Sequence, residues 1–243
     1  MFTDLKPKAV LFDFYETLLN IRTDEEDPAV WDKLARYLQY QGISIDAGAL
    51  QQAYVDLAKQ RLEQNHQRFP EINVYSIFQK ILSDKGHANS TQLITSTAQL
   101  FRVLSIRHFE LFSDTLLTLQ TLRQNYTIGL ITDAQRVFLE PEIQITGLQS
   151  FFDVMIVSSD YDFHKPDPRM FTMALEKIGV APEQALYVGD SWSRDIVGAQ
   201  SVGIQAILLN RKNHAHNFTG AHKPFKTIRS LDELRHGGLF YTP

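Results

Sequence analysis

Side chains that can do chemistry follow several apolar segments of this chain. Asp13 ends the run AVLF, Thr132 ends TIGLIT, and Asp190 follows the segment ALYVG. Lys165 lies in HKPDP, and Asp195 lies shortly after Asp190. Carboxylates that meet in one crevice repel one another unless a cation joins them. Because the candidate ligands are oxygens, without His or Cys, the set favours Mg²⁺ over zinc.

The remaining two groups suit a phosphate. The hydroxyl of Thr132 and the ammonium of Lys165 can contact phosphate oxygens. A carboxylate within reach of phosphorus can act as a nucleophile and form an acyl phosphate. The residue types therefore predict Mg²⁺-dependent phosphoryl transfer through Asp13. Singly, each residue has a plainer interpretation: Asp133 would cap the following helix, and Asp195 would be an acid at a helix N-terminus.

A parallel sheet would bring these residues together. The apolar run AVLF is typical of a strand buried on both faces, and ligands collect outside the carboxyl ends of such strands. Alternating strands and helices predict right-handed crossovers and a Rossmann-like α/β core with helices on both faces. The strands are expected over Thr127–Thr132, Val154–Ser158, Ala185–Val188 and Ile204–Leu209; the helices over Thr115–Gln124 with Leu116 inward, Gln135–Thr146 interrupted by Pro141, Pro168–Gly179 and Asp195–Gly203; a polar loop over Asn210–Lys226; and a helical turn over Ser230–Leu234.

The segment 20–108 lacks this alternation. Apolar stripes at helical spacing predict helices near Trp31, Asp46, Val74 and Leu93, and no strand is expected between Asn20 and Arg107. We therefore expect an all-helical insertion over 20–108. It would stand as a lid over the carboxyl edge of a core formed by 1–19 and 109–243.

Composition excludes several other classes of protein. The net charge of the 243 residues is −4 without a basic cluster, which argues against nucleic-acid partners. The chain has no cysteine and no apolar run of membrane-spanning length. The start MFTDLKPK is not followed by the apolar region of a signal peptide, so we expect a cytoplasmic protein. A monomer and a homodimer both agree with the sequence.

The chain resembles the haloacid dehalogenase-like (HAD) hydrolase superfamily, in the subfamily with an inserted helical cap (type I). Its motifs occur in order as FDFYETL, LITD, HKPDPRMF and YVGDSWSRDIVGAQSVG. The resemblance covers the whole chain. It implies that Asp13 is the nucleophile, and that Mg²⁺ is held by Asp13, Asp190 and the backbone carbonyl of Tyr15.

The resemblance also assigns the other polar residues. It implies that Asp195 supports the metal, directly or through water, and that Thr132 and Lys165 bind the transferring phosphate. Phosphatases of the family carry a general acid–base Asp where this chain has Tyr15. Such catalysis is worth roughly 10²–10⁴-fold, and a tyrosine is a poor base at neutral pH. Glu16 follows directly, so its side chain is expected to point elsewhere.

Three functions stay open at this stage. A Mg²⁺-dependent phosphatase of small phosphorylated metabolites, weakened by Tyr15, is favoured. A silent binding or regulatory protein that keeps the fold is the first alternative. A 2-haloacid dehalogenase is the second, because that branch carries a Tyr at the position of Tyr15. It has Ser, Asn and Tyr, however, where this chain has Asp190, Trp192 and Phe171.

Overall fold

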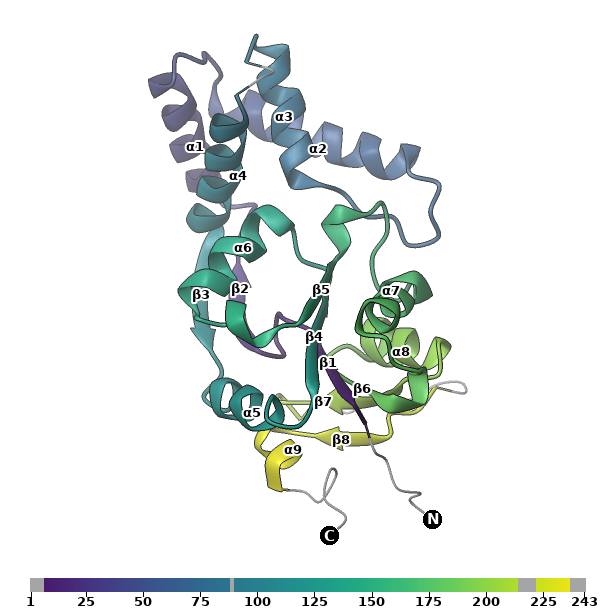
Figure 1. Ribbon diagram of the computed structural model, residues 1–243. Coiled ribbons are helices and arrows are strands. Elements are labelled where there is room, and N and C mark those ends of the chain that lie inside the picture. Colours follow the sequence, from purple (N-terminus) through teal and green to yellow (C-terminus); the bar gives the residue numbers. More distant parts are fainter. Residues whose placement is uncertain (1–6, 88–89, 214–221, 237–243) are drawn as a thin grey trace.

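A parallel six-stranded sheet forms the centre of the molecule (Figure 1). The computed structural model describes residues 7–87, 90–213 and 222–236. The strands lie in the order β5-β4-β1-β6-β7-β8, and every pairing between neighbours is parallel. Their bounds are β1 Ala9–Phe12, β4 Thr127–Thr132, β5 Val154–Val157, β6 Ala185–Gly189, β7 Gln205–Leu209 and β8 Lys226–Ile228.

Helices cover both faces of this sheet (Figure 1). Helices α5 (Thr115–Leu122), α6 (Arg136–Ile145) and α9 (Asp232–His236) lie on one face, and α7 (Pro168–Ile178) and α8 (Val197–Ser201) lie on the other. Successive residues of β1 alternate between the two cores: Val10 and Phe12 belong to one, Leu11 to the other. The predicted Rossmann-like α/β fold is confirmed.

The strand order fixes where a ligand can bind. From β1 the chain proceeds to β4 and β5 on one side and then returns to β6 on the other side of β1. The point where the strand order reverses is the usual ligand crevice of such sheets, at the carboxyl ends of the strands. Asp13 follows β1 directly at this point.

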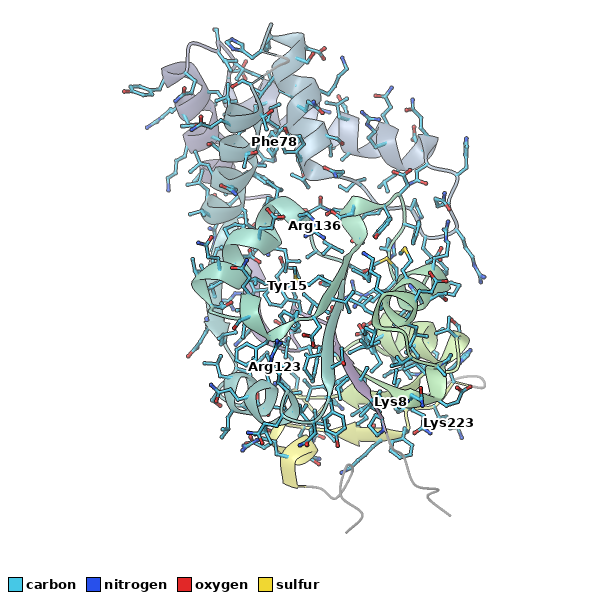
Figure 2. The ribbon with its side chains drawn as sticks, viewed as in Figure 1. Lys8, Tyr15, Phe78, Arg123, Arg136 and Lys223 are labelled. Carbon is cyan, nitrogen blue, oxygen red and sulfur yellow. The ribbon has the colours of Figure 1, made fainter. Side chains whose placement is uncertain are left out.

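The helices α1 (Pro28–Tyr40), α2 (Ala47–Gln64), α3 (Val74–Asp84) and α4 (Thr91–Ser105) form a separate layer. They enclose their own apolar cluster, in which the ring centre of Phe101 lies 5.1 Å from that of Trp31 and 5.5 Å from that of Phe78. Figure 2 shows Phe78 among these helices. The carboxylates of Asp27 and Asp46 cap α1 and α2 as N-cap residues. These helices agree with the predicted ones.

One prediction about this segment is wrong. Strands β2 (Leu19–Thr23) and β3 (Ile106–Leu111) form an antiparallel ribbon at its two ends, where no strand was expected before Arg107. The sequence LNIRT alternates apolar and polar residues from Leu19 to Arg22, and this short alternation was the available signal of a half-exposed strand. The pairing depends on a partner far away in the chain. The predicted division at 19/20 and 108/109 would cut this ribbon, and the domain boundaries stay a prediction.

Smaller predictions also need correction. Helix α6 continues through Pro141, because the carbonyl of Val137 that loses its helical donor accepts from the side-chain amide of Gln99 at 3.4 Å. Leu116 is 41% exposed and does not face the core. Strand β8 and a π turn over Trp192–Ile196 were not expected. Residues 214–221 of the predicted loop, and 1–6 at the start, lie outside the described residues.

None of the described helices combines the length and the apolar character that crossing a bilayer requires.

Candidate active site

Asp13 and Lys165 form a buried ion pair at the carboxyl end of β1. Asp13 is 8% exposed, and its backbone N–H donates to the carbonyl of Val188, which continues the pairing of β1 with β6. The ammonium of Lys165 lies 2.7 Å from Oδ1 of Asp13. Lys165 is only 2% exposed, so water contributes little to its solvation and its charge needs carboxylate partners.

The side chain of Asp133 holds the backbone of Lys165 in place. Its Oδ1 accepts the backbone N–H of Lys165 at 2.9 Å. The expectation that Asp133 caps the next helix is wrong, since α6 is preceded by Gln135 and has no side-chain cap. Asp133 instead joins the loop after β4 to the loop after β5.

Asp195 completes the cage around Lys165. Its Oδ1 lies 2.6 Å from the Lys165 ammonium, and its Oδ2 accepts the backbone N–H of Ser191 at 2.8 Å. Gly189 makes this close approach possible, because a Cβ there would lie 2.4 Å from Cγ of Asp195. Asp195 is therefore more than an acid at a helix N-terminus, as the plainer interpretation had it.

The sequence interpretation missed Tyr187, which belongs to this cluster. Tyr187 lies on β6, and its ring is fully buried against Phe171 of α7. Its hydroxyl accepts from Lys165 at 3.1 Å and lies 2.9 Å from Oδ1 of Asp195. A phenol inside an otherwise apolar strand was the available signal, because a buried hydroxyl needs a polar partner.

Asp190 brings a third carboxylate to the site. Asp13, Asp190 and Asp195 each offer an oxygen, and these oxygens lie within 4.8 Å of one another. Burial raises the pKa of Asp13 to about 8; Lys165 opposes this rise, and the charges of Asp195 and Asp190 add to it. Burial, followed by the charge of Asp195, raises the pKa of Asp190 to about 6. Three carboxylates and one ammonium therefore share this site.

This donor set fits a hard cation. All the donors are carboxylate oxygens, which Mg²⁺ prefers, and an added positive charge would relieve the repulsion that adds to the effect of burial on both pKa values. The two oxygens of Asp195 already accept hydrogen bonds from the protein. The fit is therefore best for direct contact through Asp13 and Asp190.

Thr132 offers an unused hydroxyl close to these groups. It ends β4, the strand paired with β1, and is fully buried. Across the described residues its Oγ1 has no hydrogen-bond partner. Leaving a buried hydroxyl unpaired costs about 1–3 kcal/mol, so this position suits an acceptor supplied by a ligand.

Tyr15 turns its hydroxyl toward the helices instead of toward Lys165. The hydroxyl donates to Oε2 of Glu142 on α6 at 2.8 Å, and Arg102 of α4 donates to Oε1 of Glu142 at 2.7 Å. Burial raises the pKa of Tyr15 above its ordinary value, the Arg102 charge opposes this, and the Glu142 charge adds to it. Glu16 also points elsewhere, as expected, and pairs with Lys212 at 2.6 Å.

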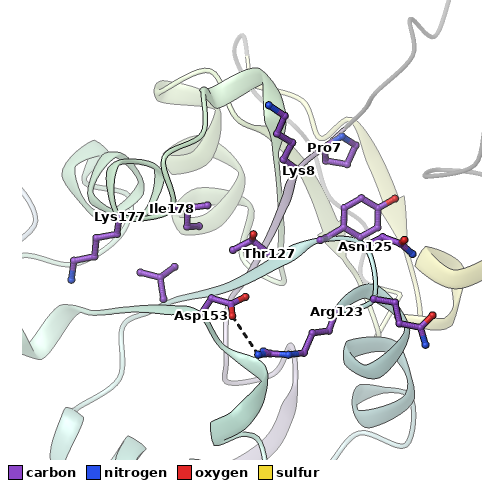
Figure 3. A pocket seen from close by; sticks show the side chains of 11 residues that line it. Pro7, Lys8, Arg123, Asn125, Thr127, Asp153, Lys177 and Ile178 are labelled. Carbon is purple, nitrogen blue, oxygen red and sulfur yellow. Dashed lines mark ion pairs between the residues drawn. The ribbon is translucent and has the colours of Figure 1, made fainter.

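Two cavities lie at opposite ends of the parallel strands. A cavity of about 700 Å³ lies at the amino ends of β1, β4 and β5, beside Lys8, Thr127 and Val154 (Figure 3). Its wall includes the ion pair of Arg123 and Asp153. A second cavity, of about 420 Å³, borders Asp190. Only the second lies at the end of the sheet where the carboxylates meet.

Fold, motif order and site geometry together define the class of this protein, and comparison with known proteins agrees. The family model described as haloacid dehalogenase-like hydrolase matches residues 44–209. The chain belongs to this family of hydrolases.

Individual relatives are similar over most of their length. A glyceraldehyde 3-phosphate phosphatase of Methanothermobacter thermautotrophicus is 30% identical over 208 residues, which are 84% of this chain and 85% of the relative. The crystal structure of a HAD phosphatase from Thermococcus onnurineus is 28% identical with a TM-score of 0.58, covering 94% of this chain and 96% of that one. A 2-haloacid dehalogenase from Pseudomonas syringae, at 24% identity and a TM-score of 0.68 over 95% and 97% of the two chains, shares the fold.

Proposed function

We propose that this protein is a slow, Mg²⁺-dependent phosphatase of small phosphorylated substrates that acts through an aspartyl-phosphate on Asp13. The observation that carries the proposal is the convergence of Asp13, Asp190 and Asp195, two of which, Asp13 and Asp195, contact one buried lysine. Among the described residues, the buried hydroxyl of Thr132 also lacks a hydrogen-bond partner. The similarity to two phosphatases supports it.

In the first step, a carboxylate oxygen of Asp13 attacks phosphorus while the bond from phosphorus to the leaving oxygen breaks. The Lys165 ammonium, 2.7 Å from Asp13, would hold the negative phosphoryl oxygens next to the nucleophile. The free hydroxyl of Thr132 would donate to the same group. Water then attacks phosphorus, releases inorganic phosphate and restores the Asp13 carboxylate.

Asp13, Asp190 and the backbone carbonyl of Tyr15 are the residues we assign to the metal. When bound, Mg²⁺ would supply positive charge that keeps the carboxylates ionised and neutralises the phosphate. Asp195 acts as a positioning residue, because it fixes the Lys165 ammonium through a 2.6 Å contact and is itself fixed by Ser191.

The rate is limited by Tyr15. Its hydroxyl is bound to Glu142 and its pKa is raised, so at neutral pH it stays protonated and cannot activate water. The leaving oxygen must then take its proton from water. We therefore expect turnover below that of a phosphatase with an acid–base aspartate at this position.

The test is hydrolysis of a panel of small phosphate esters with Mg²⁺ and with a chelator, using wild type and Asp13→Asn. Turnover that needs both Mg²⁺ and Asp13 supports the proposal. Equal, low rates of hydrolysis in wild type and Asp13→Asn contradict the proposal. Release of halide from 2-chloropropionate in the presence of a chelator would show that the protein is a dehalogenase instead. Binding of phosphate esters without turnover would favour a silent binding protein. The expected cytoplasmic location and monomeric or homodimeric state stay predictions.

A further inference from the structure

The cavity beside Asp190 contains charged groups that the proposed reaction does not use. Its volume is about 420 Å³, and Ile21 of β2 and Leu209 of β7 form apolar parts of its wall. Glu16, Arg211 and Lys212 supply the charges. Since Asp190 borders the same cavity, a group bound there would lie next to the reacting phosphate.

Glu16 holds an unusual backbone conformation in this wall. Its φ is +59°, in the left-handed region, which costs a residue other than glycine roughly 1–2 kcal/mol. Its carboxylate lies 2.6 Å from the ammonium of Lys212. The lysine side chain is 66% exposed, and such a pair contributes only about 0–1 kcal/mol, so an incoming anion can replace the glutamate.

Arg211 is held in place by the protein. Its two terminal nitrogens donate to the carboxylate of Asp114 at 2.9 and 2.8 Å, and one also donates to the carbonyl of Thr17 at 2.9 Å. Among the described residues of this wall, the exposed ammonium of Lys212 is therefore the positive group that an incoming anion can reach.

This inference rests on the proposed phosphatase function. We infer that the substrate's leaving group carries a second anionic group, a carboxylate or a phosphate, and that Lys212 binds it in the cavity beside Asp190 in place of Glu16. Lys212 is thus a specificity-determining residue, and Glu16 competes with the substrate for it.

Three substrates test this inference. Ethyl phosphate has no second anionic group, phosphoglycolate has a carboxylate as its second anionic group, and ethylene glycol bisphosphate has a second phosphate. Wild type should show a KM at least tenfold lower for one of the two doubly anionic esters than for ethyl phosphate, and the preferred ester identifies the source of the second charge. Lys212→Met should bring this KM ratio toward one. Glu16→Gln should increase the ratio about threefold, because the competing carboxylate is gone. Lys80→Met is the matched control, since Lys80 pairs with Asp84 on the exposed side of α3, and its ratio should equal that of wild type.

A binding measurement gives a second readout without turnover. The probes for calorimetry are ethylphosphonate, phosphonoacetate and methylenediphosphonate. Wild type should bind phosphonoacetate or methylenediphosphonate more tightly than ethylphosphonate, and Lys212→Met should lose this difference in affinity. Turnover of ethyl phosphate with a KM ratio near one in wild type, or a ratio that Lys212→Met leaves unchanged, overturns this inference alone. Absence of both turnover and phosphonate binding overturns the phosphatase proposal together with it.

Discussion

Tyr15 donates a 2.8 Å hydrogen bond to Glu142, a residue 127 positions later on α6. Glu142 also accepts from Arg102, whose guanidinium lies 5.1 Å from the centre of the Tyr15 ring. The network joins the loop after the nucleophile to α6 and to α4. The position at which phosphatases of the family carry their acid–base aspartate is therefore occupied by a structural contact.

Replacing Tyr15 by Asp should restore the missing acid only when Glu142 is also changed. In Tyr15→Asp, the new carboxylate would be buried near Glu142, and like charges would raise its pKa and loosen the loop. We expect Tyr15→Asp/Glu142→Gln to hydrolyse a generic aryl phosphate about tenfold faster than wild type or more, and faster than Tyr15→Asp alone. Equal rates in the double variant and wild type would show that the missing acid does not limit turnover.

Arg102 should matter for stability more than a surface arginine. Arg102→Met leaves the 4% exposed Glu142 carboxylate without its cation, and breaking a buried pair in this way costs about 3–5 kcal/mol. The matched control is Arg107→Met, whose guanidinium pairs with Asp27 at the surface and should cost about 1 kcal/mol or less. Urea unfolding of both variants measures the difference, and equal losses would argue against the buried network.

Gly189→Ala should displace Asp195. The added methyl would lie 2.4 Å from Cγ of Asp195, so the cage around Lys165 must open. We expect a loss of about 1–3 kcal/mol and a large drop in turnover. Gly48→Ala is the control, since its nearest contact is an ordinary 3.5 Å and alanine favours helix α2 by up to about 1 kcal/mol. A Gly189→Ala protein with normal stability and turnover would contradict the described packing.

Mg²⁺ should stabilise the folded protein, since it would relieve the repulsion between Asp13 and Asp190. At a tenfold excess over its Kd, a ligand of the native state adds about 1.4 kcal/mol, and chelation should reverse the gain. Asp190→Asn should lose this dependence of stability on Mg²⁺. Asp84→Asn, which changes an exposed side chain of α3, should keep it. Thermal unfolding with Mg²⁺ and with chelator measures the effect; an identical dependence in the two variants would exclude Asp190 as a ligand.

Asp114 should give the protein an acid-sensitive stability. Burial alone would raise its pKa, but hydrogen bonds from Arg211 and Ser230 outweigh this and hold the pKa below its usual range. A depressed pKa stabilises the fold above the unfolded value of about 4, and that stability is lost as pH falls through the lower folded value. Asp114→Asn should therefore cost about 1.5–3 kcal/mol at neutral pH and flatten the decline of the unfolding free energy below about pH 4. A decline as steep as that of wild type would refute this.

Patterns of neighbouring residues were enough to predict most of the fold. Three runs, which precede Asp13, end at Thr132 and precede Asp190, are apolar enough to identify buried strands. The helices predicted between them imply crossover connections and therefore a parallel sheet. The ribbon of β2 and β3 lacks such buried runs. LNIRT alternates apolar and polar residues over a few positions only, and its partner is a distant segment that the fold brings beside it, with Leu19 opposite Leu111.

The sequence by itself determined that Asp13, Lys165, Asp190 and Asp195 would meet, because parallel strands place their carboxyl ends at one edge. Only the tertiary structure decided what each side chain contacts there. Tyr187 became part of the lysine cage because its strand lies beside β1. The Tyr15 hydroxyl found Glu142 because α6 packs next to the nucleophile loop, a contact between residues too distant in the chain for any local pattern to report.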